Sequence, residues 1–288
     1  MLNLGLIGDI HLLQPFIKKA LDHPEIHITG KSSVGIHPQP ENFRLSVPEF
    51  NRIELIERSD ALLVNRFSLL PFQMLCSMVK KSKHFFAATY PGLSIEQCLH
   101  LAKLAQEAKT IIQVSNPFYY SPAIQWLNRN LKKPAFISGS CFRNEIPDND
   151  LLIQLLLMLK NLSGIRTKKT GVVSFRSNPA DSIYNNLQIE CSNGLILSLS
   201  YGKKGLPHEF KIKSYAQDQF AEFDLLKNTA FCNQIPIDLS SLKKENETDS
   251  FIHAVIHAKT SITGLEDYSS ALQTAETIRA KQEQFIPL

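Results

Sequence analysis

Short apolar runs alternate with helix-like patterns in the first part of the chain. Residues 2–7 form an apolar run that ends at Gly8, which is typical of a buried parallel strand. Apolar residues then recur at helical spacing until Pro24, namely Leu12, Phe16, Ala20 and Leu21. Further strand-like runs follow at residues 26–29, 61–64, 84–88 and 111–114. Strands that alternate with helices of about 10–15 residues predict βαβ units and an α/β fold with a doubly wound parallel sheet.

The pattern changes after Pro122. An apolar helix is expected at residues 150–162, and several strand-like runs follow it. The runs 183–191 and 195–201 flank Asn193-Gly194, which predicts a hairpin because both residue types tolerate positive φ. A closing helix is expected at residues 266–281. This order predicts an α+β domain with a mostly antiparallel open sheet, so we divide the chain into domains 1–121 and 122–288.

Composition narrows the class of protein. The chain has 288 residues, of which 43% are hydrophobic and 20% are charged, as in ordinary globular proteins. Its 31 basic and 27 acidic residues give a net charge of +4 that is spread along the chain, so no nucleic-acid partner is expected. The most apolar stretch, residues 151–159, is too short to cross a bilayer, so no membrane partner is expected. Five cysteines without a Cys-x-x-Cys pair favour a reducing, cytoplasmic location over a disulfide framework.

Several motifs follow one another in a recognisable order. Gly5-Leu-Ile-Gly8-Asp9 follows the first strand and opens a helix, which is the context of a dinucleotide-binding fingerprint. The next motifs are Asp60-Ala-Leu-Leu-Val, Lys83-His84, Leu93-Ser-Ile-Glu, the segment from Asn116 to Pro122, and an apolar helix that ends at Gly164. In this order and spacing the chain resembles the Gfo/Idh/MocA family of glucose–fructose oxidoreductases and inositol dehydrogenases.

The resemblance implies a fold, a chemistry and an assembly. Members of the family have an N-terminal Rossmann domain and a C-terminal α/β domain with a large open sheet. They usually oxidise or reduce a carbon of a sugar or polyol with NAD(P), and many form dimers through the sheet. We therefore expect a Rossmann-like dinucleotide-binding domain at residues 1–121. The substrate and dimerisation domain is expected at residues 122–288, with a homodimer formed through its sheet.

The expected cofactor site matches the family pattern only in part. Gly8 corresponds to the first glycine of the fingerprint, but Ile10 replaces the second glycine, which lets the main chain approach a diphosphate. We expect the Ile10 side chain to collide with that diphosphate, and Asp9 to repel it. After the second strand, Lys31 and Ser32 occupy the segment where the family often has an acidic residue. A lysine beside hydroxyl groups suits a 2′-phosphate, so NADP is slightly favoured over NAD. The alternatives are an ordinary polar loop and no cofactor at all.

The expected catalytic residues also depart from the family pattern. The family's Glu-Lys-Pro motif falls on Ala88-Thr89-Tyr90, so Thr89 at the cofactor site replaces a lysine and Tyr90 is the candidate acid. The alternative is that Tyr90 only begins a turn. The family's Asp and His, one helical turn apart, fall on Asp150 and Gln154. Glutamine cannot transfer protons near neutral pH. The alternative for Asp150 is that its negative charge only stabilises the N-terminal end of the helix dipole.

Two further groups have competing interpretations. Asn116 and Tyr119 follow the last strand of the first domain, where the carboxyl ends of parallel strands face a ligand crevice. They are candidate substrate-binding residues, or they pack the seam between the domains. His253 and His257 lie four residues apart, but without an obvious third ligand they predict no metal site.

Two functions remain open. In the first, the chain is an NAD(P)-dependent oxidoreductase with degenerate motifs that acts on a sugar-like or other small polar carbonyl or hydroxyl substrate. In the second, it is a catalytically inactive pseudoenzyme that binds a ligand or regulates a partner. Ile10, Thr89 and Gln154 replace residues that the family uses for cofactor binding and proton transfer, so they favour the pseudoenzyme. The resemblance to the family favours the oxidoreductase.

Overall fold

The chain forms two compact units. Unit 1 contains Met1–Ser115 and Glu245–Ser269, and unit 2 contains Asn116–Lys244 and Ser270–Leu288. The computed structural model describes residues 1–33, 43, 45–143, 148–163, 167–177, 182–203, 208–242 and 245–283.

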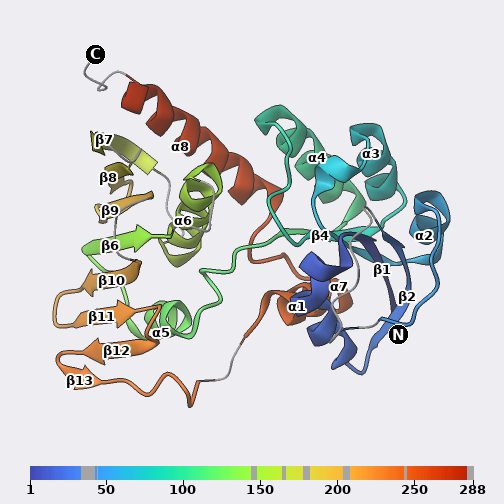
Figure 1. Ribbon diagram of the computed structural model, residues 1–288, viewed down its shortest axis with the longest axis horizontal. Helices are drawn as coiled ribbons and strands as arrows, with labels where there is room; N and C mark the ends of the chain where they lie inside the picture. The colour runs from blue at the N-terminus through green and yellow to red at the C-terminus, as the bar shows by residue number, and fades with distance from the viewer. Residues whose placement is uncertain are drawn as a thin grey trace. The chain divides into compact units, whose positions relative to one another are not determined.

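Unit 1 is built on a parallel sheet of five strands in the order β2-β1-β3-β4-β5 (Figure 1). Its strands are β1 (Leu2–Gly8), β2 (Ile26–Ser33), β3 (Ala61–Val64), β4 (His84–Ala87) and β5 (Ile112–Val114). Its helices are α1 (Ile10–Leu21), α2 (Arg52–Arg58), the 3-10 helix η1 (Phe67–Leu69), α3 (Phe72–Lys80), α4 (Ile95–Ala108) and α7 (Glu247–Ile256). Strands β3 and β5 are buried along their whole length, as expected for a sheet covered on both faces. The predicted doubly wound parallel sheet is confirmed.

Helix α1 buries only part of the apolar set that the sequence shows at helical spacing. Ala20 is buried, but Leu12 and Leu21 are 49% and 56% exposed. The buried side chains follow the same helical spacing but begin two residues earlier, at Ile10, Leu13, Ile17 and Ala20. Ile10, which replaces a fingerprint glycine, is therefore the first residue of the core face of α1.

Helix α7 brings a distant part of the sequence back to unit 1. Its residue Phe251 is 2% exposed and lies in the same hydrophobic core as Ile10 and Ile17. The Phe251 ring is centred 5.6 Å from the ring of Phe86 in β4. The predicted division at residues 121 and 122 differs from this arrangement, because a single boundary cannot describe a chain that leaves a unit and returns to it.

Unit 2 is built on a sheet of eight strands in the order β13-β12-β11-β10-β6-β9-β8-β7. Neighbouring strands are antiparallel except β6 and β9, which are parallel. The predicted hairpin at Asn193-Gly194 joins β8 to β9. The strands are β6 (Phe136–Phe142), β7 (Thr167–Ser177), β8 (Ser182–Cys191), β9 (Ile196–Lys203), β10 (Glu209–Tyr215), β11 (Phe220–Asp224), β12 (Thr229–Cys232) and β13 (Ile235–Pro236). The predicted, mostly antiparallel open sheet is confirmed.

Three helices lie on one face of the unit 2 sheet, namely α5 (Pro122–Asn130), α6 (Asp148–Ser163) and α8 (Leu265–Glu283) (Figure 1). The ring of Trp126 in α5 is centred 5.8 Å from that of Phe223 in β11, and Gln282 Nε2 in α8 donates to the Tyr201 hydroxyl at 3.1 Å. Within the described ranges of unit 2, the opposite face carries no helix. No helix in the described part of the chain has the length and apolar character needed to cross a membrane.

Replacing Ile10 tests its place in the core. Ile10→Gly should lower the free energy of unfolding by about 3–5 kcal/mol, because it removes a buried side chain and leaves a cavity. Leu12→Gly on the same helix should cost only about 1 kcal/mol, because this exposed residue mainly contributes helix propensity. Urea unfolding of both variants measures the difference, and equal losses would contradict the core position of Ile10.

Candidate functional site

The carboxyl ends of β1 and β3 form the topological switch point of unit 1. Strand β1 pairs with β2 on one side and with β3 on the other, so the connections after β1 and β2 run in opposite directions across the sheet. In open α/β sheets the ligand crevice lies outside the strand ends at such a point. The residues at these two ends are Gly8 and Asn65.

Gly8 and Asn65 are packed so closely that position 8 requires glycine. Gly8 has a φ of +122°, and a Cβ built on it would lie 2.5 Å from Asn65 Cβ. The Asn65 main chain also ties three strands together. Its N–H donates to the Ile7 carbonyl oxygen at 2.9 Å, and its carbonyl oxygen accepts from the Thr89 N–H at 2.9 Å. The loops after β1, β3 and β4 therefore meet at Asn65.

The Asn65 side chain carries an unsatisfied donor at this point. The residue is 6% exposed, and its Nδ2 has no hydrogen-bond partner among the described residues. A buried amide donor without a partner costs about 1–3 kcal/mol, so an acceptor from a ligand or from water is expected here. Arg66, the next residue, is exposed and offers a planar guanidinium, which suits phosphate oxygens. The sequence pattern did not select Asn65 or Arg66, although both directly follow a buried strand at its carboxyl end.

The start of α1 combines a favourable and an unfavourable feature for an anion. The helix begins at the switch point, where free N–H groups attract negative charge. Asp9 caps the helix, however, and its Oδ1 accepts the His11 N–H at 2.8 Å, so a carboxylate already lies there. The Ile10 side chain is 6% exposed and packs into the core. The expected collision between Ile10 and a diphosphate therefore stays a prediction.

A second chain segment pairs with β2 near its carboxyl end. The Lys31 N–H donates to the Pro48 carbonyl oxygen at 2.9 Å, and the Phe50 N–H donates to the Lys31 carbonyl oxygen at 2.9 Å. This close approach depends on Gly30, because a Cβ there would lie 2.6 Å from the Phe50 ring and 2.9 Å from the Pro48 oxygen. The pairing places Glu49 beside the end of β2.

The Glu49 carboxylate occupies the polar end of β2. Ser33 donates its N–H to Glu49 Oε1 at 2.6 Å and its hydroxyl to Oε2 at 3.1 Å. Lys31 Nζ lies 3.9 Å from Oε2, and the side chains of Lys31 and Glu49 are 12% and 52% exposed. Ser32 is buried. The more exposed charge at this strand end is thus a carboxylate, which the sequence pattern missed because it lies 16 residues beyond Ser33.

Thr89 and Tyr90 follow β4 at the same edge. The Thr89 hydroxyl donates to the Asn65 carbonyl oxygen at 2.6 Å, so its proton is engaged by the main chain. Tyr90 is partly exposed, and its ring packs edge-on against that of Tyr268 with centroids 5.4 Å apart. The Ser68 N–H donates to the Pro91 carbonyl oxygen at 3.1 Å, which fixes the segment after Tyr90. Of the two, Tyr90 is the residue able to present a proton.

The remaining predicted site residues belong to unit 2. Asp150 and Gln154 lie one turn apart on α6, and Gln154 is the partly exposed residue in the otherwise buried stretch 151–159. Asn116 and Tyr119 are 0% and 7% exposed, and the Tyr119 hydroxyl accepts a hydrogen bond from Asn128 Nδ2 at 3.1 Å. Asn116 and Tyr119 are thus part of the packing of unit 2.

Histidine and cysteine side chains form no metal centre in the described ranges, where no group of three potential ligands comes together. His253 and His257 lie side by side on and just after α7, with ring centroids 4.3 Å apart. Burial and the neighbouring His257 lower the pKa of His253, which disfavours its charged form.

The residues at the edge of unit 1 fit a nicotinamide dinucleotide. Gly8 offers bare main chain, Asn65 Nδ2 and Arg66 offer donors for phosphate oxygens, and Glu49 offers acceptors for ribose hydroxyls. The Asn65 donor bears most on this fit, because it is buried at the switch point without a partner among the described residues, and a ligand or a water there would supply its acceptor.

Comparison with known proteins identifies solved structures of the same fold. No protein-family model and no curated protein matches the chain. Among solved structures, UDP-N-acetylglucosamine 3-dehydrogenase from Acidithiobacillus ferrooxidans is similar with a TM-score of 0.80 at 18% identity, over 99% of this chain and 98% of that one. A dehydrogenase from Chromobacterium violaceum gives 0.79 at 15% identity, over 99% and 96%.

A third similar structure was solved with its ligands. Biliverdin reductase from Synechocystis sp. PCC 6803, in complex with biliverdin and NADP+, gives a TM-score of 0.71 at 14% identity, over 98% of this chain and 99% of that one. These identities are low, so the likeness concerns the fold. The chain has the fold of Gfo/Idh/MocA-type dehydrogenases, as its sequence motifs led us to expect.

Proposed function

We propose that the chain is an NAD(P)-dependent oxidoreductase of the Gfo/Idh/MocA type that acts on a sugar-like or other small polar carbonyl or hydroxyl substrate. The observation that supports this most directly is the unsatisfied Asn65 Nδ2 beside Gly8 at the switch point of the parallel sheet. The similar solved structures include dehydrogenases and a reductase, which supports oxidation–reduction as the class of reaction.

Different residues of unit 1 would bind different parts of the dinucleotide. Gly8, Asn65 and Arg66 would bind the diphosphate, and Glu49 would bind the adenosine ribose. When bound, the nicotinamide ring supplies hydride transfer at the substrate carbon. Thr89 holds the loop after β4 against Asn65 and has no proton to spare. Tyr90 is the residue that we assign to hold the proton of the substrate hydroxyl.

A specific observation keeps the pseudoenzyme as the second candidate. Thr89 donates its hydroxyl proton to the main chain, and Gln154 has no titratable group. If Tyr90 serves only to pack against Tyr268, the chain retains a ligand site without a proton-transfer group. It would then bind a dinucleotide or another ligand without turnover.

The choice between NADP and NAD depends on Glu49. Lys31 and Ser32 favour NADP in the sequence, but the Lys31 ammonium lies 3.9 Å from the Glu49 carboxylate and its side chain is only 12% exposed. A carboxylate accepts hydrogen bonds from ribose hydroxyls and repels a 2′-phosphate. The contacts of Glu49 therefore argue for NAD over NADP.

Titration with NADH and NADPH tests the proposed function. With a Kd of about 10 µM and about 1 mM nucleotide, binding should stabilise the fold by about 2.7 kcal/mol, which a melting curve detects. No stabilisation by either nucleotide would contradict the oxidoreductase proposal. Binding without turnover on a panel of sugars, polyols and small carbonyl compounds would favour the pseudoenzyme. If Ile10 obstructs the diphosphate, Ile10→Gly should bind more tightly than the wild type.

Replacing Glu49 tests the preference for NAD. Glu49→Gln should weaken NADH binding relative to NADPH by about 10-fold or more, because it removes a charged acceptor and the repulsion of a 2′-phosphate. Glu54→Gln removes a carboxylate that bonds Arg58 instead, so it should leave the ratio unchanged. Fluorescence titration of both variants gives the ratio, and a wild type that prefers NADPH would contradict the assignment.

We also propose a homodimer formed through the uncovered face of the unit 2 sheet. Exposed apolar side chains lie on its strands, including Val173, Phe175, Ile196, Tyr215 and Phe231. Exposed apolar side chains gathered on one face favour an interface. Two-fold symmetry places the same surface on both sides of such an interface, so the surface must complement itself.

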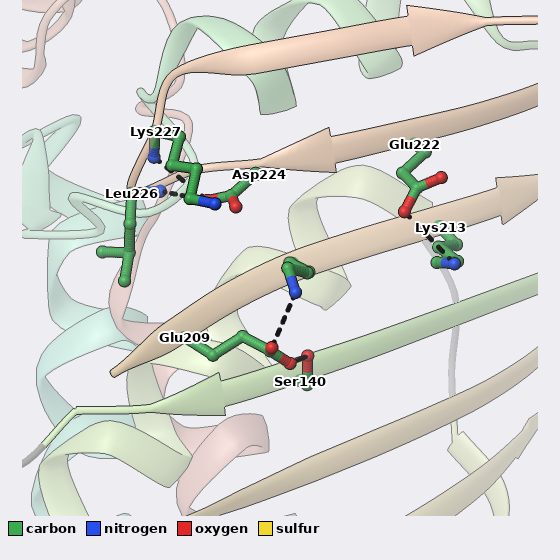
Figure 2. A network of polar contacts seen from close by, with 8 residues as sticks. Ser140, Glu209, Lys213, Glu222, Asp224, Leu226 and Lys227 are labelled. Atoms are coloured by element: carbon green, nitrogen blue, oxygen red, sulfur yellow. Dashed lines mark hydrogen bonds and ion pairs between the residues drawn. The ribbon is translucent and has the colours of Figure 1, made fainter. Parts of the chain in front are cut away.

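Charges of both signs support self-complementarity of this face. Figure 2 shows Ser140 beside the Glu209 carboxylate and Lys213 beside Glu222. Lys211 Nζ also donates to Glu209, and Lys213 Nζ lies 3.2 Å from Glu222 Oε1. Hydrogen bonds from Lys211 and then Ser140 lower the pKa of Glu209. Neighbouring positive and negative groups allow a second copy, turned about a two-fold axis, to set lysines against carboxylates.

A charge placed on this face tests the dimer. Ile196→Glu should shift the wild-type dimer to monomer, because a carboxylate would be buried without a partner. Leu226→Glu changes a residue of similar exposure in the turn after β11, so it should leave the dimer intact. Sedimentation velocity at micromolar concentration distinguishes the states, and a monomeric wild type would contradict the proposal.

We also propose a cytoplasmic location, which the cysteines support. All five are free thiols, namely Cys76, Cys98, Cys141, Cys191 and Cys232. Burial raises the pKa of Cys98 to about 12, so this thiol stays protonated and unreactive at neutral pH. Free thiols persist in reducing compartments such as the cytoplasm.

A further inference from the structure

The segment that follows β3 is tied to three other parts of unit 1. This segment, residues 65–69, contains the 3-10 helix η1 and also Asn65 and Arg66, the two side chains that we assign to the diphosphate. Hydrogen bonds connect it to the end of β1, to the start of α2 and to the loop after β4. All of these elements belong to unit 1, so the segment is held from several sides within one compact unit.

The Asn65 carbonyl oxygen accepts two hydrogen bonds from a single residue. Thr89 donates its N–H to this oxygen at 2.9 Å and its hydroxyl at 2.6 Å. A carbonyl oxygen has two lone pairs, so Thr89 uses the whole accepting capacity of this one. Because each hydrogen bond has a preferred direction, two donors restrict the orientation of the Asn65 peptide group more than one donor would.

The main chain alone determines where the Asn65 amide lies. The Asn65 N–H donates to the Ile7 carbonyl oxygen at 2.9 Å, so both main-chain polar groups of Asn65 are fixed. Its side-chain Nδ2 has no partner among the described residues. The position of this donor at the end of β1 therefore depends on the hydrogen bonds from Thr89 and to Ile7.

Arg66 lies between two further ties of the same segment. On its N-terminal side is the Thr89 contact to Asn65. On its C-terminal side, the Ser68 N–H donates to the Pro91 carbonyl oxygen at 3.1 Å. The loop after β4 therefore binds the segment on both sides of the exposed Arg66 side chain, which restricts the main chain from which that side chain extends.

The type of residue at position 89 explains the double contact. The family that the sequence resembles has a lysine at this position, and a lysine carries its donor at the end of a flexible four-carbon stem. The threonine hydroxyl is attached to Cβ, close to the main chain, so it reaches the same oxygen as the Thr89 N–H. The threonine thus makes a specific contact with the segment that carries the proposed diphosphate donors.

We propose that Thr89 is a positioning residue for dinucleotide binding, which acts by holding Asn65 at the end of β1. The inference rests on the proposed function, because it takes the Asn65 amide as a donor to the diphosphate. A donor that is already held in place loses less conformational entropy when a ligand binds. The affinity for the dinucleotide therefore depends on the Thr89 hydroxyl, although Thr89 need not touch the ligand.

Replacing Thr89 by valine removes the hydroxyl and keeps the branched shape. Thr89→Val should weaken NADH binding by about 5- to 10-fold, because the Asn65 carbonyl oxygen loses one of its two donors. Thr89→Ser keeps the hydroxyl, so it should bind NADH within about 2-fold of the wild type. Fluorescence titration gives the dissociation constants, with NADPH as the probe if the wild type prefers it.

Thr110→Val is the matched control for a purely structural effect. The Thr110 hydroxyl also donates to a main-chain oxygen, that of Val79, at 3.2 Å. Thr110 lies just before β5, at the amino ends of the strands and away from the switch point. Urea unfolding should show that both valine variants lose stability, but only Thr89→Val should weaken NADH binding. Equal Kd values for Thr89→Val and the wild type, or equal weakening by Thr110→Val, would overturn the proposal.

A double-mutant cycle tests whether Thr89 acts through Asn65. In the Asn65→Ala background, Thr89→Val should weaken NADH binding by no more than about 2-fold, because the donor that Thr89 positions is absent. The same 5- to 10-fold weakening in both backgrounds would overturn the proposal. A wild type that binds neither NADH nor NADPH would contradict the proposed function and this inference with it. A wild type that binds NADH as tightly as Thr89→Val does would contradict the inference alone.

Discussion

The close packing of Asn65 across Gly8 is the constraint on which the candidate site depends. Glycine at position 8 lets the end of β3 approach the end of β1, and the Asn65 carbonyl oxygen then holds the loop after β4 through Thr89. The cost of the arrangement is an amide nitrogen that is buried without a partner. In the proposed function, an acceptor atom of the dinucleotide would pair with this group.

At the same edge of the sheet, the residues depart from the pattern of the family that the sequence resembles. Ile10 stands in place of a glycine, but its side chain stabilises the core of unit 1. The carboxylate near the end of β2 comes from Glu49, on a segment that Gly30 allows to pair with the strand. Arg66 follows β3 and Asp9 follows β1, so the loops at this edge carry charges of both signs. In the proposed function, the departures from the family pattern at Thr89 and Gln154 concern proton transfer, whereas the departure at Ile10 concerns the binding of the diphosphate.

Sequence patterns predicted most helices and strands, but they did not predict which distant segments pack together. Buried parallel strands are short apolar runs, and the Asn193-Gly194 turn has a local signal, so both were predicted. The core face of α1 could not be predicted in this way, because residues 10 and 12 are both apolar and only packing distinguishes them. The return of α7 and the contact between Ser33 and Glu49 join residues far apart in sequence, which no local pattern encodes.

A crystal of the chain soaked with NADH would show directly whether the ends of β1 and β3 bind a dinucleotide. We expect density for a dinucleotide with its diphosphate between Gly8 and Arg66, and with Asn65 Nδ2 within about 3.2 Å of an acceptor atom. Clear density for the dinucleotide away from the ends of β1 and β3, or an Asn65 amide that stays unpaired in the complex, would contradict it.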